Sequence, residues 1–214
     1  MICTSIGEST MQKCLDALEG LAFAEIRLDK MAVAIGDVRN IFSRHSRLIA
    51  TCRPGEIEDE KRKVFLIEAI SAGAAFVDLE VDSEDTFKNE IVRHARARGC
   101  RVIVSYHDFE RTPKRAELEH VVDWCFETGA DIAKIACRVN STGECALLLG
   151  LLHDSRPLVV VGMGRKGRIT RIVAPLLGSL FTYASAGEGR ETEEGQIDRE
   201  SLEGIWERLK NVRD

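Results

Sequence analysis

The 214-residue sequence lacks the features that mark several large classes of protein. It has no block of basic residues, and its net charge is −5 with acids and bases spread along the chain, so no nucleic-acid partner is indicated. Its longest apolar runs, such as residues 146–152, are far too short to span a bilayer. The first residues, Met1-Ile2-Cys3-Thr4-Ser5, lack the basic and apolar regions of a signal peptide. We therefore expect a cytoplasmic protein without a membrane or nucleic-acid partner.

Paired cysteines are also missing. The seven cysteines are scattered and form no CxxC pair, so neither a zinc site nor a disulfide framework is indicated. We expect most of them to be small core side chains in a reducing compartment. The chain also lacks a linker and a low-complexity segment. Its length and its 44% hydrophobic content therefore predict one domain over residues 1–214.

Short β-rich segments recur along the chain, and segments with helical periodicity separate them. The predicted strands are 2–6, 23–29, 48–53, 76–82, 101–107, 132–138, 158–163 and 180–185. The predicted helices are 11–18, 61–72, 87–98, 116–126, 145–152, 169–177 and 202–212, with a less regular one at 32–42 that Gly36 interrupts. Gly73, Gly99 and Gly129 follow three of these helices, as C-terminal glycines commonly do.

The order of these elements is a strand followed by a helix, eight times. Such alternation predicts a parallel sheet covered by helices. Eight units in 214 residues fit a compact, closed (β/α)₈ TIM barrel. An open doubly wound sheet is the rival fold, but the even spacing and the absence of a linker favour the barrel.

Lys134 lies in the middle of an apolar predicted strand, Asp131-Ile132-Ala133-Lys134-Ile135-Ala136-Cys137. Lysine is rarely buried without a partner or a task. An ammonium group in a medium of low dielectric tends to lose its proton, and a neutral lysine is a nucleophile. This residue therefore suggests covalent chemistry through an imine. The alternative is a lysine that reaches solvent or pairs with a nearby acid.

Polar side chains recur on one face of the predicted strands, because side chains in a strand alternate between its two faces. Arg27, Arg53, Glu80, His107 and Lys134 follow one another at separations of 26, 27, 27 and 27 residues. In a barrel this spacing places them side by side at the C-terminal mouth, where barrel enzymes have their active sites. The alternative is a structural network of buried ion pairs, which apolar packing could often replace.

The residue types in this ring suggest specific roles. His107 lies one repeat before Lys134 and is suited to proton transfer beside an imine. Arg27, Arg53 and Arg171 are candidates to clamp a carboxylate, since a guanidinium group matches it bidentately. Glu25 and Glu80 could orient His107 or accept hydrogen bonds from substrate hydroxyls.

Two loops are further candidates. The segment Gly162-Met163-Gly164-Arg165-Lys166-Gly167 matches GxGxxG, but only 47 residues follow it and segment 180–185 has no acid, so a dinucleotide site is disfavoured. We interpret it as a flexible anion-facing loop after strand 7. The polar segment 186–196 is either a lid over the barrel mouth or a solvated connection.

These segments resemble the type I 3-dehydroquinate dehydratase family. The resemblance covers the whole chain and rests on Glu25-Ile26-Arg27-Leu28-Asp29, Thr51-Cys52-Arg53, Ser105-Tyr106-His107-Asp108 and Ala133-Lys134-Ile135-Ala136. It implies a (β/α)₈ barrel and a homodimer. It also implies the dehydration of 3-dehydroquinate to 3-dehydroshikimate in the shikimate pathway, through a lysine imine and with neither a metal nor an organic cofactor. The partner would be a cyclic keto acid.

Carried over by position, the resemblance makes Lys134 the imine-forming residue and His107 the general acid and base. The implied substrate-binding residues are Glu25, Arg27, Arg53, Arg171, Thr192 and Gln196. The implied supporting residues are Glu56, Glu80, Ser105, Met163 and Tyr183.

The sequence departs from the family pattern in two places. The loop Pro54-Gly55-Glu56-Ile57-Glu58 lacks the usual glycine pair, so that either Glu56 or Glu58 could fill the role of the loop glutamate. The chain also begins almost directly at the first strand, without a preceding hairpin, so we expect a more open barrel floor.

Two other functions remain open at this stage. A class I aldolase-type barrel acting on a small phosphorylated sugar would share the imine lysine but would need a phosphate site near residues 162–167. A barrel that binds a small anion without turnover is the non-enzymatic alternative, against which the inward pair of His107 and Lys134 argues.

Overall fold

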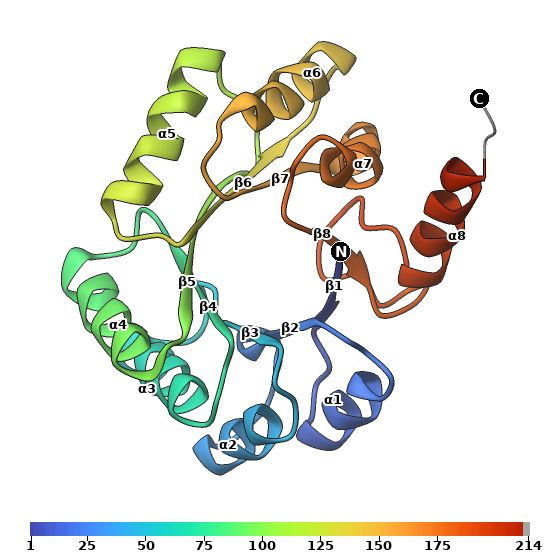
Figure 1. Ribbon diagram of the computed structural model, residues 1–214. Helices are drawn as coiled ribbons and strands as arrows, with labels where there is room; N and C mark the ends of the chain where they lie inside the picture. Colours follow the sequence, from blue (N-terminus) through green and yellow to red (C-terminus); the bar gives the residue numbers. More distant parts are fainter. Residues whose placement is uncertain (212–214) are drawn as a thin grey trace.

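The computed structural model describes residues 1–211, in which eight parallel strands form a ring surrounded by helices (Figure 1). The strands are β1 (Ile2–Ile6), β2 (Ala24–Arg27), β3 (Leu48–Thr51), β4 (Phe76–Glu80), β5 (Arg101–Asp108), β6 (Ile132–Arg138), β7 (Leu158–Met163) and β8 (Thr182–Ser185). The α-helices are α1 (Met11–Leu18), α2 (Ile35–Ser43), α3 (Asp59–Ser71), α4 (Asp85–Arg98), α5 (Arg115–Glu127), α6 (Thr142–Gly150), α7 (Gly164–Val173) and α8 (Arg199–Lys210). Three short 3₁₀ segments are η1 (Leu28–Lys30), η2 (Leu151–His153) and η3 (Ala174–Leu176).

The strand order confirms the barrel and excludes the open doubly wound sheet. Consecutive strands pair in parallel from β1 to β7, and β8 pairs with β1. The seam between β7 and β8 is joined by one backbone hydrogen bond, in which Leu180 N donates to Leu158 O at 3.0 Å. The chain thus forms a nearly closed (β/α)₈ barrel.

Most predicted elements are present, with shifted ends. Helix α2 forms although it contains Gly36, because the Asp37 carboxylate accepts a hydrogen bond from Ala34 N and caps its first turn. The predicted strand 23–29 ends at Arg27, where η1 turns the chain back. Val212, the last residue of the predicted helix 202–212, lies outside the described residues. The glycines expected to end helices adopt positive φ angles, +110° at Gly73 and +67° at Gly99.

The sequence suggested that segment 162–167 is a flexible loop, and this expectation is wrong. Strand β7 runs to Met163, and α7 begins at Gly164 without an intervening connection. A Cβ atom on Gly167 would lie 2.4 Å from the carbonyl carbon of Gly162. The GxGxxG pattern therefore reflects close packing between β7 and α7, for which a side chain leaves no room.

The barrel interior has an apolar lower half and a charged upper half. The lower half is built from inward side chains near the N-terminal ends of the strands, which are Cys3, Phe23, Ile49, Ile103, Ile132, Val159 and Phe181. The rings of Phe23 and Phe181 pack edge to face, with centroids 5.1 Å apart, and both are buried. The floor is therefore closed by the barrel's own aromatic side chains, and the expectation of an open floor is wrong.

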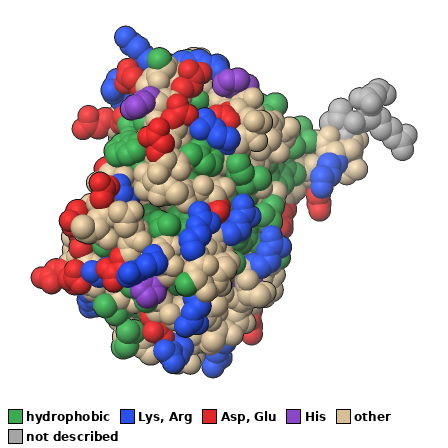
Figure 2. Space-filling model, turned by 60° about the vertical axis from the view of Figure 1, so that its left-hand side comes forward, with side chains coloured by type: hydrophobic (Ala, Val, Ile, Leu, Met, Phe, Trp, Pro, Cys, Tyr) green, Lys and Arg blue, Asp and Glu red, His purple; other side chains and the backbone are tan. Residues whose placement is uncertain are grey.

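The outer surface agrees with the even distribution of charge in the sequence. Figure 2 shows acidic and basic side chains sharing the face that carries α3 to α5, with apolar side chains scattered between them. No helix within residues 1–211 is both long enough and apolar enough to cross a membrane. All seven cysteines are buried and unpaired, as expected for core side chains.

Candidate active site

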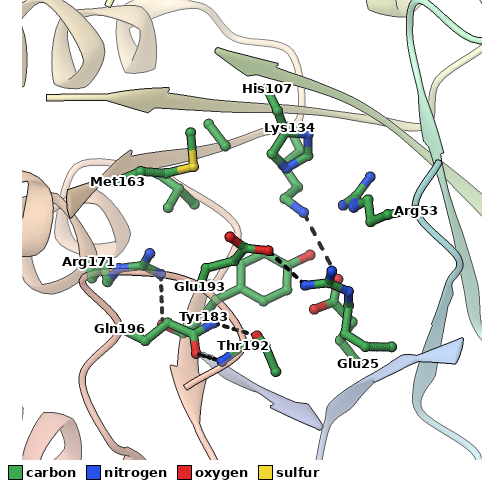
Figure 3. Close-up of a pocket in the computed structure, with 13 residues that line it drawn as sticks. Glu25, Arg53, His107, Lys134, Met163, Arg171, Tyr183, Thr192, Glu193 and Gln196 are labelled. Carbon is green, nitrogen blue, oxygen red and sulfur yellow. Dashed lines mark hydrogen bonds and ion pairs between the residues drawn. The ribbon is translucent and has the colours of Figure 1, made fainter. Parts of the chain in front are cut away.

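A pocket at the C-terminal mouth of the barrel brings together most of the predicted site residues (Figure 3). Its walls come from strands β2 and β5 to β8, from Arg53 two residues after β3, from α7 and from the segment between β8 and α8. The lining residues are Glu25, Arg27, Arg53, His107, Lys134, Ala136, Val161, Met163, Arg171, Tyr183, Thr192, Glu193 and Gln196. The inward face that the alternation of side chains predicted is therefore the face that forms this pocket.

Lys134 is buried at the bottom of the pocket, with 5% of its surface exposed. Its Nζ donates to Asp78 Oδ2 at 3.2 Å and lies 4.0 Å from Glu25 Oε1. The ammonium also lies 4.6 Å from the centroid of the Tyr183 ring. Two carboxylates and an aromatic face thus surround a buried primary amine at the bottom of the pocket.

Asp78 links Lys134 to Arg53. The Asp78 carboxylate accepts from Arg53 Nη1 at 2.9 Å and Nη2 at 3.0 Å, and from Ser105 Oγ at 2.6 Å. Burial by itself would raise the pKa of Asp78, but the charges of Arg53 and Lys134 outweigh burial and hold that pKa well below its usual value. Asp78 is therefore a fixed anion that positions both cations.

Replacing Asp78 with asparagine should make the free energy of unfolding vary less with pH in the acid range. The folded pKa of Asp78 lies below the unfolded value of about 3.9, so its contribution to stability is fully present above that value and is lost as the pH falls below it. We expect the variant to be less stable by about 3 kcal/mol at pH 7, because two buried cations lose their shared partner. Urea unfolding of both proteins from pH 7 to pH 2 tests this. If the difference in unfolding free energy between the two proteins stayed constant below pH 4, the proposed role of the Asp78 carboxylate would be contradicted.

The register of the strands corrects the predicted position of Lys134. The repeat of 27 residues placed Lys134 beside His107, but β6 pairs with β5 so that Lys134 lies opposite Ser105 and Ala136 lies opposite His107. Lys134 is thus one inward position deeper than His107. A ligand can therefore lie on the amine while its upper part faces the imidazole.

His107 is oriented by Glu80. Its Nδ1 lies 2.9 Å from Glu80 Oε2, so the N–H of Nδ1 donates to the carboxylate and Nε2 is left free to accept a proton. Burial and the charge of Arg53 lower the pKa of His107, while Glu80 opposes that change. Burial alone would raise the pKa of Glu80, but Arg53 and His107 lower it. At neutral pH the pair is a neutral imidazole beside a carboxylate, an arrangement suited to general base catalysis.

Arg171 and Tyr183 present buried polar atoms without a partner in the described residues. Arg171 is 1% exposed, its Nε makes no hydrogen bond, and its Nη1 reaches only the carbonyl oxygen of Tyr183, at 3.3 Å. Burial lowers the pKa of Arg171 to about 10, an effect that Glu193 partly offsets, so the guanidinium remains charged at neutral pH. A buried cation with unused donors is suited to an anionic ligand.

The segment 186–196 covers the mouth of the barrel rather than lying free in solvent. Thr192 and Gln196 are buried, and Gln196 Oε1 accepts from Thr192 N at 2.8 Å. Thr192 Oγ1 donates to Ser5 Oγ at 2.8 Å, and Ser5 Oγ donates to Glu25 Oε2 at 2.6 Å. This chain of hydrogen bonds connects the segment to the charged interior, which favours the lid over the solvated connection.

Three predicted supporting residues do not line the pocket. Glu80 and Ser105 lie behind it, as partners of His107 and Asp78 respectively. Glu56 is exposed in the segment before α3, and so is its alternative Glu58, so the structure places neither glutamate against the other site residues.

Sequence reasoning assigned no role to four residues that belong to this site. Asp78 shares the inward face of β4 with Glu80, and Ala136 shares that of β6 with Lys134. Period-2 alternation could have identified both residues. It could also have identified Val161, which lies two residues before Met163 and therefore on the same face of β7. Glu193 has no such signal, because it lies in a segment without a regular period.

The pocket holds no cluster of metal ligands. Within residues 1–211, no group of three or more His, Cys, Asp or Glu side chains is arranged to bind a metal ion. The functional groups of the site are thus an amine, an imidazole, carboxylates and guanidinium groups.

Comparison with known proteins shows the family to which this chain belongs. The model of the family described as type I 3-dehydroquinase matches residues 2–211. A 3-dehydroquinate dehydratase of Desulfotalea psychrophila is 33% identical over 97% of this chain and 97% of that protein. One of Methanococcus vannielii is 34% identical over 96% of this chain and 98% of that protein. The crystal structure of the type I enzyme of Clostridium difficile has the same fold, with a TM-score of 0.86 at 24% identity over 99% of this chain and 92% of that one. The chain therefore belongs to the type I 3-dehydroquinase family, as the resemblance of its motifs implied.

Proposed function

We propose that this protein dehydrates 3-dehydroquinate to 3-dehydroshikimate through an imine at Lys134. The observation that carries the proposal is a buried primary amine that shares one pocket with His107 and with Arg171, whose Nε has no hydrogen-bond partner in the described residues. The amine can react with a ketone, the imidazole can transfer protons, and the guanidinium can hold a carboxylate. A cyclic keto acid carries the groups that all three would recognise.

The first step is attack of Lys134 Nζ on the ketone carbon. A C–N bond forms, the carbonyl oxygen takes one proton from the attacking nitrogen and a second from the imidazolium of His107, and it leaves as water as the C=N bond of the imine forms. The protonated imine is an electron sink that acidifies the neighbouring C–H. Loss of that proton gives an enamine, whose electron pair expels the hydroxide from the next carbon. Hydrolysis of the imine then returns the amine and releases the enone product.

His107 supplies the proton transfers. Its free Nε2 takes the proton that the Lys134 ammonium loses before attack and returns it to the departing carbonyl oxygen. It then takes the proton of the C–H and gives it to the departing hydroxide, which leaves as water. Glu80 stabilises the imidazolium at that stage, because its carboxylate lies 2.9 Å from Nδ1.

The substrate carboxylate would bind at Arg171, with Arg27 adding positive charge from the opposite wall. Glu25 would accept hydrogen bonds from substrate hydroxyls, and Thr192 and Gln196 would contact the ring from the lid. Such preorganised charge lowers the cost of reorganisation in the transition state. A closed lid also keeps bulk water from the imine.

A direct assay tests the proposal. Purified protein incubated with 3-dehydroquinate should produce the conjugated enone, which absorbs in the ultraviolet and which NMR can identify as 3-dehydroshikimate. Lack of turnover by folded protein would refute the proposed activity. Release of an aldehyde from a phosphorylated sugar would instead support the aldolase alternative.

We also propose that the protein acts in the cytoplasm as a homodimer, without a metal or an organic cofactor. Light scattering coupled to gel filtration should give twice the 23.8 kDa mass of one chain. A mass of one chain at micromolar concentration would contradict the dimer. Activity that survives dialysis against a chelator would support independence from metals.

A further inference from the structure

Glu193 is an acidic residue that fills part of the pocket although the proposed reaction assigns it no task. Its Oε1 accepts from Arg27 Nη1 at 2.9 Å. Figure 3 shows its side chain extending from the lid into the middle of the labelled residues, with Arg171 on one side and Arg53 on the other. Its side chain is 36% exposed, so Glu193 also faces the outside of the mouth.

The carboxylate of Glu193 lies where an anionic ligand would lie. It is a negative group acting on Arg171, whose pKa it raises against the effect of burial. It also pairs with Arg27, whose other side is held by Asp29. A ligand carboxylate placed at Arg171 would meet a like charge in the same small space, which costs free energy in a medium of low dielectric.

The space left beside Glu193 is too small for a ring. The cavity has a volume of about 30 Å³, which at about 10–15 Å³ for each water molecule holds roughly two of them. A six-membered ring with a carboxylate and hydroxyl groups cannot enter unless a side chain moves. Glu193 can move, because its side chain is partly exposed and its carboxylate has a single side-chain partner, Arg27.

We propose that Glu193 is an internal competitor that determines the affinity of the site for carboxylate ligands. In the empty protein its carboxylate occupies the anion position between Arg27 and Arg171. A ligand carboxylate displaces it outward and takes its place, so that the number of anions in the pocket stays constant. This inference rests on the proposed function, since it assumes a substrate that carries a carboxylate.

The rest of the lid does not have to leave with Glu193. Thr192 and Gln196 anchor the segment to Ser5 on one side. On the other side Glu194 pairs with Arg138, and its carbonyl oxygen accepts from Gly164 N at 3.2 Å. Glu194 therefore provides a matched control, since it is a neighbouring lid glutamate in a salt bridge that does not line the pocket.

The experiment measures binding of quinate, a cyclic hydroxy acid that lacks the ketone and cannot form an imine. Isothermal titration should show that Glu193→Gln and Glu193→Ala bind quinate about tenfold more tightly than the parent protein. That factor corresponds to an open form that makes up about one tenth of the empty protein. Glu194→Gln should leave the Kd within about twofold. In turnover, KM for 3-dehydroquinate should fall in the two Glu193 variants by a similar factor.

An unchanged or weaker affinity in both Glu193 variants would overturn the proposal, and so would an equal gain in Glu194→Gln, because the gain would then come from general loosening of the lid. The titration does not depend on catalysis. If no variant turns over 3-dehydroquinate, the proposed function fails, while the comparison of Kd values still decides the role of Glu193.

Discussion

Sodium borohydride added together with 3-dehydroquinate should fix the substrate covalently to Lys134. The reagent reduces an imine to a stable secondary amine, so the intact mass should rise by one ligand and the modified peptide should contain Lys134. Lys134→Met should remove both the label and the activity. We expect kcat/KM to fall by about four orders of magnitude, which is about 5.5 kcal/mol at 1.36 kcal/mol for each tenfold change. The loss is large because the variant retains no nucleophile to form the electron sink.

The structure supplies a matched control for this experiment. Lys88 is also buried, with its Nζ donating to Val81 O at 2.5 Å, but it lies outside the pocket. Lys88→Met should keep the label on Lys134. The fold of Lys134→Met should survive, because Asp78 keeps its two hydrogen bonds to Arg53, and circular dichroism can verify this. An adduct on another lysine, or normal turnover by Lys134→Met, would refute the imine mechanism.

The sequence was sufficient for the architecture because the barrel repeats one simple pattern. Each strand is short, and the inward faces of β2 to β5 change from apolar to polar or charged toward their C-terminal ends. In β5, for example, Ile103 lies in the apolar lower half, and Ser105 and His107 lie higher on the same face. Alternation at period 2 therefore predicted which side chains face inward before their neighbours were known.

The ends of the strands and the depth of each side chain in the barrel depend on tertiary contacts, which a local sequence pattern does not contain. Strand β2 stops at Arg27 because the Asp29 carboxylate folds back onto that guanidinium, with Nε and Nη2 at 3.0 and 2.8 Å. The depth of Lys134 is set by the register between β5 and β6, which a count of residues along the chain cannot give. Equal spacing in sequence predicted neighbours at one height, whereas adjacent strands of a barrel are staggered.

Residues in the connecting segments were the least predictable. GxGxxG suggested a loop, but the decisive fact is the close approach of Gly162 and Gly167, which needs both elements in place. Glu193 lies in a segment whose course is fixed by Ser5 and Arg138, residues from distant parts of the chain. Asp78 lies on the same face of β4 as Glu80, but its role depends on Arg53 and Lys134, which come from other parts of the chain and share its carboxylate.

Removing the imidazole should give the second largest loss of activity. We expect His107→Ala to lower kcat by about 10²- to 10⁴-fold, the usual contribution of a general acid and base. The variant keeps Lys134, so borohydride should still label it slowly in the presence of 3-dehydroquinate. His120, which is exposed on α5, provides the control, and His120→Ala should retain the parent rate. Full activity in His107→Ala would remove His107 from the mechanism.

The pH profile distinguishes a proton-transfer role of His107 from mere packing. Burial and Arg53 lower the pKa of His107, and Glu80 raises it, so kcat should fall on the acid side as the imidazole becomes protonated. Glu80→Gln removes the raising effect, and its acid limb should therefore shift to lower pH. The plateau rate should also fall, because the neutral amide no longer stabilises the imidazolium. A stopped-flow or steady-state profile from pH 4.5 to pH 9 measures both changes. If the acid limb of Glu80→Gln moved to higher pH or stayed in place, the titrating group would not be His107.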